Sequence, residues 1–313
     1  MKRIALLFPG QGSQAVGMGK ALYDEYPEVR KLFDKADELL GNELTTLMFE
    51  GPKEKLTETE NTQPALLLTG VAVHQLLINE NIQPVMAAGH SLGEYSALVA
   101  SGAMSFEEAL PLVATRGRLM EEAFPKGKGS MAAVLGMSRE AIEQAIEQLD
   151  EDEVVDIANL NCPGQIVISG SKEGIDAAAE LLKENGAKRV MPLNVSGPFH
   201  SRLMKPANEQ FAKELDQTTF RNADIPVYAN VTAEPVTDKN MVKDLLIRQL
   251  YSPVRFEESV RHMINEGVDA FVELGTGKVL SGLVRKIDRK TKTFAIQDPD
   301  SLNDFLTWYK EES

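Results

Sequence analysis

The chain has 313 residues, 43% of them hydrophobic and 26% charged, which is the composition of an ordinary water-soluble protein with a sizeable core. Its 33 basic and 47 acidic residues give a net charge of -14, and this excess of negative charge argues against a nucleic acid partner. The single cysteine, Cys162, excludes an internal disulfide, and the four histidines lack the spacing of a zinc motif, so we expect no metal site.

The first predicted element is an apolar strand over Arg3–Phe8. Its apolar run is too short for a signal peptide or a membrane helix, so we expect a cytoplasmic protein without a membrane partner. The next segment, Gly10-Gln-Gly-Ser-Gln-Ala15, fits the dinucleotide-binding pattern G-x-G-x-x-A, in which a second strand ends in an acidic residue about twenty residues on. Lys20–Leu40 has helical spacing instead, which weakens that interpretation and favours a loop that offers backbone N–H groups to an oxyanion.

A second strand, Val85–Gly89, leads into Gly89-His-Ser-Leu-Gly93 and then into a segment rich in Ala and Leu. Strand, G-x-S-x-G and helix in this order are typical of a nucleophile elbow, in which a sharp turn exposes the serine hydroxyl. A serine that only caps the helix explains the same letters, but the preceding strand favours Ser91 as a nucleophile. The turn also points the backbone N–H of Leu92 toward an oxyanion formed at the serine.

A serine nucleophile needs a base, and His200 is the best candidate among the four histidines. It lies in the loop Ser196–Ser201, from which a side chain can project into a cleft. His90 leaves the elbow in a different direction from the serine and is interpreted as a support of the turn, while His74 and His262 fall in helices. No acidic residue directly precedes the candidate base, so a distant acid or a backbone carbonyl must orient its imidazole.

A long amphipathic helix is predicted over Phe106–Phe124. Arg116 lies about 60° from the centre of its apolar stripe, whereas Arg118 lies about 140° away, on the solvent side. An inward-facing guanidinium is costly to bury unless it meets an anion. That anion is either a carboxylate of the protein, in a structural ion pair, or a substrate carboxylate held in a bidentate clamp.

The middle of the chain has a different order of elements. From Gly129 to Pro192, in about seventy residues, the pattern predicts β-α-β-β-α-β, which is the ferredoxin-like order. Loop-forming residues flank it on both sides. We therefore predict a small ferredoxin-like domain over residues 128–196.

Strands alternate with helices in the rest of the chain, which indicates a parallel sheet covered by helices. The later predicted strands are Ile225–Ala229, Asp269–Leu274 and Lys292–Ile296. The predicted fold is therefore α/β, with a hydrolase-like parallel-sheet large domain over residues 1–127 and 197–313 into which the small domain is inserted. The segment Glu273–Lys278 hints at a phosphate loop but lacks its first glycine and the Ser or Thr after the lysine.

Several of these segments together resemble the malonyl-CoA:acyl carrier protein transacylases, the malonyl loaders of fatty acid synthesis, over essentially the whole chain. The residues that carry the resemblance are Gly10-Gln-Gly-Ser, Gly89-His-Ser-Leu-Gly-Glu94, Arg116, Asn159-Leu-Asn161, Gly197-Pro-Phe-His200 and Gln249. The resemblance implies that Ser91 is the nucleophile, with His200 as its base. It also implies that the backbone N–H groups of Gln11 and Leu92 form an oxyanion hole and that Arg116 binds the malonyl carboxylate.

The same resemblance implies that the backbone carbonyl of Gln249, and not an acidic side chain, orients the imidazole of His200. Asn159 and Asn161 would line the cleft from the small domain. Phe199 would mark the malonyl-selective form, because relatives that use branched extenders carry a smaller residue there.

The implied reaction is a ping-pong transfer from malonyl-CoA to the phosphopantetheine thiol of acyl carrier protein, with no bound cofactor, by a protein expected to be a monomer. Acyl carrier proteins are acidic, so a chain of negative net charge needs a local basic surface to bind them. The candidate basic residues are Lys126, Lys128, Lys188, Arg189, Arg285, Lys286, Arg289 and Lys290.

Three alternatives remain open at this point. A serine esterase or patatin-like lipase would use the same elbow with water as acceptor, and would have an acid partner for the base but no use for Arg116. A dinucleotide-binding protein is a second alternative. An acyltransferase of the same fold that serves polyketide synthesis is a third, and the sequence does not separate it from one that serves fatty acid synthesis.

Overall fold

Six strands form the central sheet of the structure, a computed structural model that describes residues 2–311. Their order is β10-β9-β1-β2-β7-β8, and every neighbouring pair is parallel except β7 and β8. The strands are β1 (Ile4–Phe8), β2 (Met86–Gly89), β7 (Val227–Tyr228), β8 (Pro235–Val236), β9 (Ala270–Leu274) and β10 (Lys292–Ile296). In the parallel register Phe8 is opposite Gly89, so the loops that leave β1 and β2 emerge side by side.

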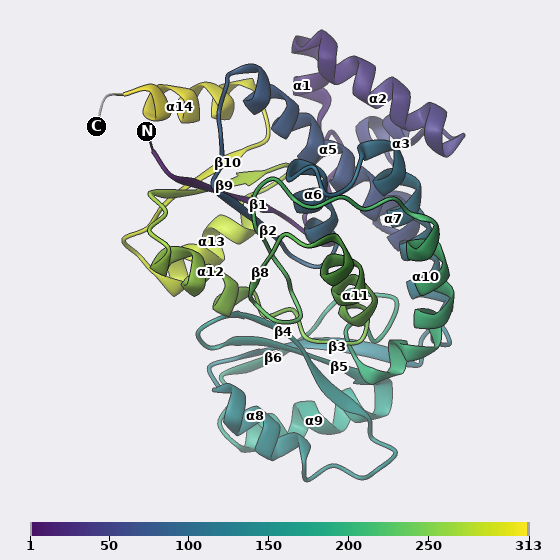
Figure 1. The fold of residues 1–313 in the computed structure, drawn as a ribbon. Helices are drawn as coiled ribbons and strands as arrows, with labels where there is room; N and C mark the ends of the chain where they lie inside the picture. The colour runs from purple at the N-terminus through teal and green to yellow at the C-terminus, as the bar shows by residue number, and fades with distance from the viewer. Residues whose placement is uncertain (1, 312–313) are drawn as a thin grey trace.

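Helices cover both faces of this sheet (Figure 1). Alternate side chains of β1 point to opposite faces: Leu6 and Phe8 join the cluster that contains α5, α6 and α7, and Leu7 joins the cluster that contains α12 and α13. The helices are α1 (Lys20–Glu25), α2 (Pro27–Leu40), α3 (Leu44–Glu50), α4 (Lys53–Thr57), α5 (Thr59–Asn79), α6 (Leu92–Ala100), α7 (Phe106–Glu122), η1 (Arg202–Met204), α10 (Lys205–Gln217), α11 (Lys239–Gln249), α12 (Phe256–Asn265), α13 (Val279–Ile287) and α14 (Pro299–Lys310).

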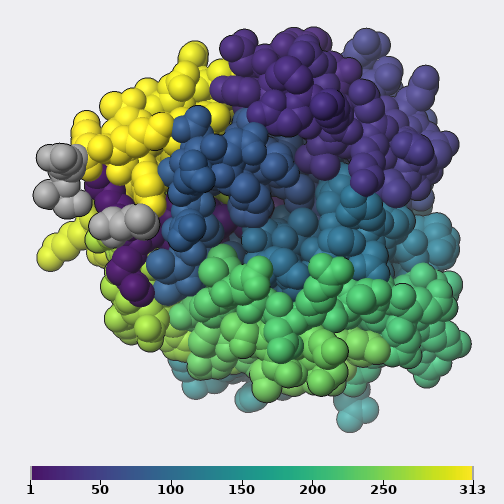
Figure 2. Space-filling model, turned by 45° about the horizontal axis from the view of Figure 1, so that its top comes forward, coloured from purple at the N-terminus to yellow at the C-terminus, as the bar shows by residue number. Residues whose placement is uncertain are grey.

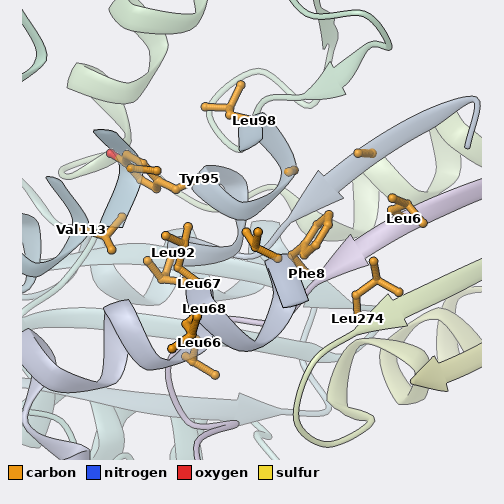
Figure 3. Packing of buried hydrophobic residues seen from close by; sticks show 14 of the residues in the cluster. Leu6, Phe8, Leu66, Leu67, Leu68, Leu92, Tyr95, Leu98, Val113 and Leu274 are labelled. Carbon is orange, nitrogen blue, oxygen red and sulfur yellow. The ribbon is translucent and has the colours of Figure 1, made fainter. Parts of the chain in front are cut away.

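The larger core lies where α5 and α6 meet the sheet (Figure 3). Leu66 and Leu67 of α5 and Leu92 of α6 pack with Phe8 and Leu274 from the strands. On the outer surface, the N-terminal residues, the segment that contains α5 and the residues around α10 and α11 lie together on one face (Figure 2). Within residues 2–311 we find no helix that is both long and apolar enough to cross a membrane.

A second sheet is antiparallel, in the order β4-β5-β3-β6, with α8 (Arg139–Ile146) and α9 (Lys172–Glu184) packed on it. Its strands are β3 (Gly129–Leu135), β4 (Val155–Cys162), β5 (Gln165–Ser171) and β6 (Arg189–Pro192). The edge strand β4 is tied to the rest of the molecule through Val254, which donates to the carbonyl of Ala158 at 2.8 Å and accepts from Leu160 at 2.9 Å. The predicted α/β class with a parallel sheet and a second β-α-β-β-α-β unit is confirmed.

Two predicted elements differ from those observed. The single helix expected over Lys20–Leu40 is wrong, because α1 ends at Glu25 and α2 begins at Pro27, with Tyr26 extended between them at φ -111°. A residue before proline avoids the helical region, and proline is favoured at the first position of a new helix. The strand expected over Ile225–Ala229 is reduced to the two residues of β7.

Candidate active site

Ser91 lies in a strained turn between β2 and α6, with φ 52° and ψ -106°. The turn is tight enough that a Cβ on Gly89 would lie 1.9 Å from the carbonyl carbon of Gly93, so only glycine fits there. Asn230 holds the turn, because its Oδ1 accepts from the Ser91 N–H at 2.8 Å and its Nδ2 donates to the Gly89 carbonyl at 2.6 Å. Although the serine stands at the N-cap position of α6, its side chain makes no capping hydrogen bond, so the hydroxyl points elsewhere.

The Ser91 hydroxyl meets His200, whose Nε2 lies 2.8 Å from Oγ. The other ring nitrogen, Nδ1, lies 2.9 Å from the backbone carbonyl of Gln249. A carbonyl only accepts, so Nδ1 carries the proton and Nε2 is left to accept the serine proton. Burial, followed by the nearby Arg116 charge, lowers the pKa of His200 to about 3, so the imidazole is neutral at neutral pH.

The other three histidines do not contact the serine hydroxyl. His90 Nε2 lies 2.8 Å from Asn161 Oδ1 on β4, which places His90 between the elbow and the small sheet. His262 donates through Nδ1 to the carbonyl of Ala233 at 2.8 Å, and His74 is buried in α5.

Arg116 is 1% exposed, and its guanidinium contacts the serine hydroxyl. Nη1 donates to Gln63 Oε1 at 2.9 Å, and Nη2 donates to Gln249 Oε1 at 2.9 Å and to Ser91 Oγ at 3.2 Å. All three direct partners are uncharged oxygens, so the guanidinium is not in the structural ion pair that the sequence left open. Its Nε is buried with no partner among the described residues. Arg118 faces solvent and pairs with Glu122, as its position on the helix predicted.

Behind Arg116 lies a buried polar network that the sequence did not reveal. The Gln249 side chain is completely buried, and its Nε2 donates to Glu94 Oε2 at 2.7 Å, to the Ser91 carbonyl at 3.1 Å and to Asn230 Oδ1 at 3.2 Å. Glu94 Oε2 also accepts from the Asn230 N–H at 3.0 Å. With Nε2 facing acceptors, Gln249 can present only Oε1 to Arg116. One glutamine therefore orients both the histidine, through its backbone, and the arginine, through its side chain.

The cavity in front of the serine has a volume of about 440 Å³ and opens between the two sheets. Gln11, Asn159 and Phe199 line it together with the serine and the histidine. Asn161 is not among the lining residues, since its side chain turns to His90 instead. The main chain of Leu92, at the first position of α6, directly follows the serine.

The loop after β1 packs closely on the elbow. A Cβ on Gly10 would lie 2.3 Å from the His90 carbonyl oxygen, so a larger residue would push the loop away. This contact brings Gln11 to the cavity that Ser91 also lines. Two segments distant in the sequence thus meet at this edge of the cavity.

Three residues of the site were missed in the sequence: Gln63, Glu94 and Asn230. Glu94 had a signal, because it ends the Gly89–Glu94 motif and is the one charged residue of α6. Gln63 and Asn230 are uncharged residues outside any motif, so only the fold reveals them.

Neither a metal site nor a phosphate loop is formed by the described residues. We find no group of three or more His, Cys, Asp and Glu side chains in residues 2–311 that could hold a metal ion. The segment that hinted at a phosphate loop is occupied by the protein itself, because the buried Glu273 carboxylate accepts from the N–H groups of Leu280 at 3.0 Å and Ser281 at 2.8 Å. This carboxylate caps α13 where a phosphate would bind.

Comparison with known proteins places this site in a family. The acyl transferase domain family matches residues 5–293. A malonyl CoA-acyl carrier protein transacylase of Bacillus subtilis is 55% identical over 100% of this chain and 99% of its own. A solved acyl carrier protein S-malonyltransferase from Vibrio cholerae is 46% identical, with a TM-score of 0.95 over 97% of this chain and 100% of its own. A malonyl-transacylase solved in complex with a type II PKS acyl-carrier protein is 40% identical, with a TM-score of 0.95 over 98% of this chain and 99% of its own. The chain therefore belongs to the acyl transferase family, among the malonyl CoA-acyl carrier protein transacylases, and is an acyltransferase.

Proposed function

We propose that this chain transfers the malonyl group of malonyl-CoA to the phosphopantetheine thiol of an acyl carrier protein, through a malonyl ester on Ser91. The observation that carries this proposal is the buried Arg116, whose Nη2 lies 3.2 Å from Ser91 Oγ and whose direct partners are all uncharged. A cation in that position suits an acyl group that carries its own carboxylate.

In the first half of the reaction, His200 Nε2 accepts the Ser91 proton as Oγ attacks the thioester carbonyl. The backbone N–H groups of Gln11 and Leu92 stabilise the oxyanion, at about 3 kcal/mol for each donor. The C–S bond then breaks, and the CoA thiol leaves with the proton held by His200. The Gln249 carbonyl keeps the imidazole in the tautomer that both transfers need.

In the second half, the carrier-protein thiol enters the same cavity and His200 accepts its proton. The thiolate attacks the malonyl ester, and the serine oxygen leaves with that proton, which restores the free enzyme. Phe199 and Asn159 line the path of both thiols. Arg116 holds the distal carboxylate throughout, so the reacting carbonyl stays in place between the nucleophile and the oxyanion donors.

A serine hydrolase is the second candidate, since it would use the same serine and histidine. It fits less well, because the base here is oriented by a carbonyl and not by an acid, and because a hydrolase of neutral esters gains nothing from Arg116. We further propose that the chain acts as a monomer in the cytoplasm in fatty acid synthesis. Its large domain would cover residues 1–127 and 197–313, and its small domain residues 128–196.

Intact mass after brief exposure to malonyl-CoA tests the function. We expect one added malonyl group per chain, absent in Ser91→Ala, and lost to holo acyl carrier protein much faster than to water. A malonyl adduct that survives in Ser91→Ala, or that water removes as fast as the carrier protein does, would refute the proposed transfer.

A further inference from the structure

The positive charge of Arg116 has a carboxylate close by, but not in direct contact. Glu94 is 3% exposed and is linked to Arg116 through the Gln249 amide, with Nη2 of the arginine 2.9 Å from Oε1 and Nε2 of the amide 2.7 Å from Glu94 Oε2. The three groups form a chain of guanidinium, amide and carboxylate. One buried anion, separated from the guanidinium by a single side-chain amide, therefore lies near the buried cation.

We propose that Glu94 is the resident counter-ion of Arg116 and that it takes up one proton when the malonyl carboxylate binds. This inference rests on the proposed function, specifically on the pairing of Arg116 with the substrate carboxylate. Glu94 does not touch the substrate in this scheme and acts as a positioning residue.

The reason is charge balance in a buried site. With malonyl bound, two carboxylates would share one guanidinium, and the surplus negative charge would have little solvent around it. A buried carboxylate without a compensating charge is costly enough that it takes up a proton instead. The malonyl carboxylate contacts the guanidinium directly and stays ionised, so the proton goes to Glu94.

The surroundings of Glu94 favour this uptake. The charged and titratable groups near it are Arg116 on α7 and Tyr95 on α6, while α11 and the segment after β7 contribute the uncharged Gln249 and Asn230. Burial raises the pKa of the Glu94 carboxyl to about 7, against the opposing effect of hydrogen bonds from Asn230 and Gln249 and of the Arg116 charge. A substrate carboxylate on the guanidinium weakens that last effect, so the pKa of Glu94 rises further when the site is filled.

The proton comes from solvent when the malonyl ester forms and returns to solvent when the carrier protein removes it. Two consequences follow for the wild-type protein. Its preference for malonyl over acetyl donors should fall as pH rises above the pKa of Glu94, because a smaller fraction of sites carries the proton that malonyl binding requires. Acylation by malonyl-CoA should also consume a proton that acylation by acetyl-CoA does not.

The first experiment needs no variant. Stoichiometric acylation of Ser91 is followed at pH 8 in weakly buffered solution with an indicator dye, using malonyl-CoA and acetyl-CoA in parallel so that ionisation of the released CoA thiol cancels. We expect an extra uptake of about 0.9 proton per malonylated chain, because a carboxyl of pKa about 7 is about nine-tenths ionised at pH 8. Equal proton changes with the two donors would overturn the inference.

The second experiment compares Glu94→Gln with wild type. The glutamine carbonyl can accept the bonds from Asn230 and Gln249 that Glu94 Oε2 now accepts, so the substitution removes the charge and keeps the geometry. In wild type the ratio of kcat/KM for malonyl-CoA to that for acetyl-CoA should fall about tenfold between pH 6 and pH 8. In Glu94→Gln this ratio should not change with pH. Glu107→Gln is the matched control, because Glu107 is exposed and pairs with Lys35, and in this variant the ratio should fall as it does in wild type.

A ratio in Glu94→Gln that still falls tenfold would overturn the inference. Failure of the proposed function would give a different result: intact mass measurement would detect no malonyl adduct on Ser91. If Glu94→Gln does not fold, the proton uptake of the wild-type protein alone decides.

Discussion

Replacement of Arg116 by alanine tests the proposed carboxylate clamp most directly. The substitution removes the guanidinium that lies 3.2 Å from Ser91 Oγ and leaves the amide oxygens of Gln63 and Gln249 without the bonds they now accept at 2.9 Å. We expect malonyl transfer to fall strongly, while acetyl transfer falls much less, because an acetyl group has no carboxylate to hold.

The structure sets the size of this effect. A charge-assisted hydrogen bond contributes about 1.5 to 3 kcal/mol, and a bidentate carboxylate makes two. When acetyl occupies the site, however, the guanidinium still bonds to Gln63 and Gln249, so it is not left bare. The net discrimination is therefore smaller than the sum of two such bonds, at about 2 to 3 kcal/mol, or roughly 30- to 150-fold in kcat/KM.

The assay is the ratio of kcat/KM for malonyl-CoA to that for acetyl-CoA, measured by acylation of Ser91. Arg118→Ala is the matched control, because it lies on the same helix, pairs with Glu122 in solvent and should leave the ratio unchanged. Arg116→Lys keeps the charge without the fork and should give an intermediate ratio. A folded Arg116→Ala protein with the wild-type ratio would refute the clamp.

Three further predictions follow. The pKa of His200 is about 3 in the folded protein and about 6.5 in the unfolded chain, so the contribution of its neutral form to stability is complete above pH 6.5 and is lost as pH falls toward 3. The free energy of unfolding in urea should therefore be lower at pH 5 than at pH 7. In His200→Asn this difference between the two pH values should be smaller by about 2 kcal/mol. Reversal of charge at the exposed Arg285 and Lys286 should raise the KM for acyl carrier protein about tenfold at low salt and less at high salt, and an unchanged KM would exclude this surface. Phe211→Ala, which removes a completely buried ring against Tyr95, should lower the free energy of unfolding by about 3 to 5 kcal/mol in urea titration, and a loss below 1 kcal/mol would contradict the packing.

The parts of the fold that sequence patterns predicted are those set by local chemistry. The elbow was predicted from Gly89 and Gly93, two small residues where a strand is followed directly by a helix in the sequence. The break between α1 and α2 was missed because the apolar spacing runs through it, although Pro27 marked it. Local spacing and turn residues thus specify elements well. At Pro27 the proline outweighs the periodicity and begins a new helix, whereas Pro64 and Pro111 lie inside α5 and α7.

The interior of the site was predicted less completely, for a physical reason. The position of Arg116 on the apolar face of its helix indicated an inward guanidinium, but the sequence offered only anions as its partners. The structure supplies neutral amides from Gln63 and Gln249, which come from helices 53 and 133 residues away in the chain. Amide side chains have no strong positional preference, so their convergence depends on tertiary packing and leaves no sequence pattern.

The choice of a carbonyl to orient His200 follows from the same electrostatics. An aspartate at Nδ1 would stabilise the imidazolium better than the Gln249 carbonyl does, as it does in serine hydrolases. It would also place a second anion within the small buried space that holds Arg116, where it would pair with the guanidinium and compete with the substrate carboxylate. The carbonyl fixes the tautomer without adding charge, and Glu94 is kept one amide away from the arginine. A site that must bind an acyl carboxylate therefore gives up some stabilisation of its base in order to keep its cation available.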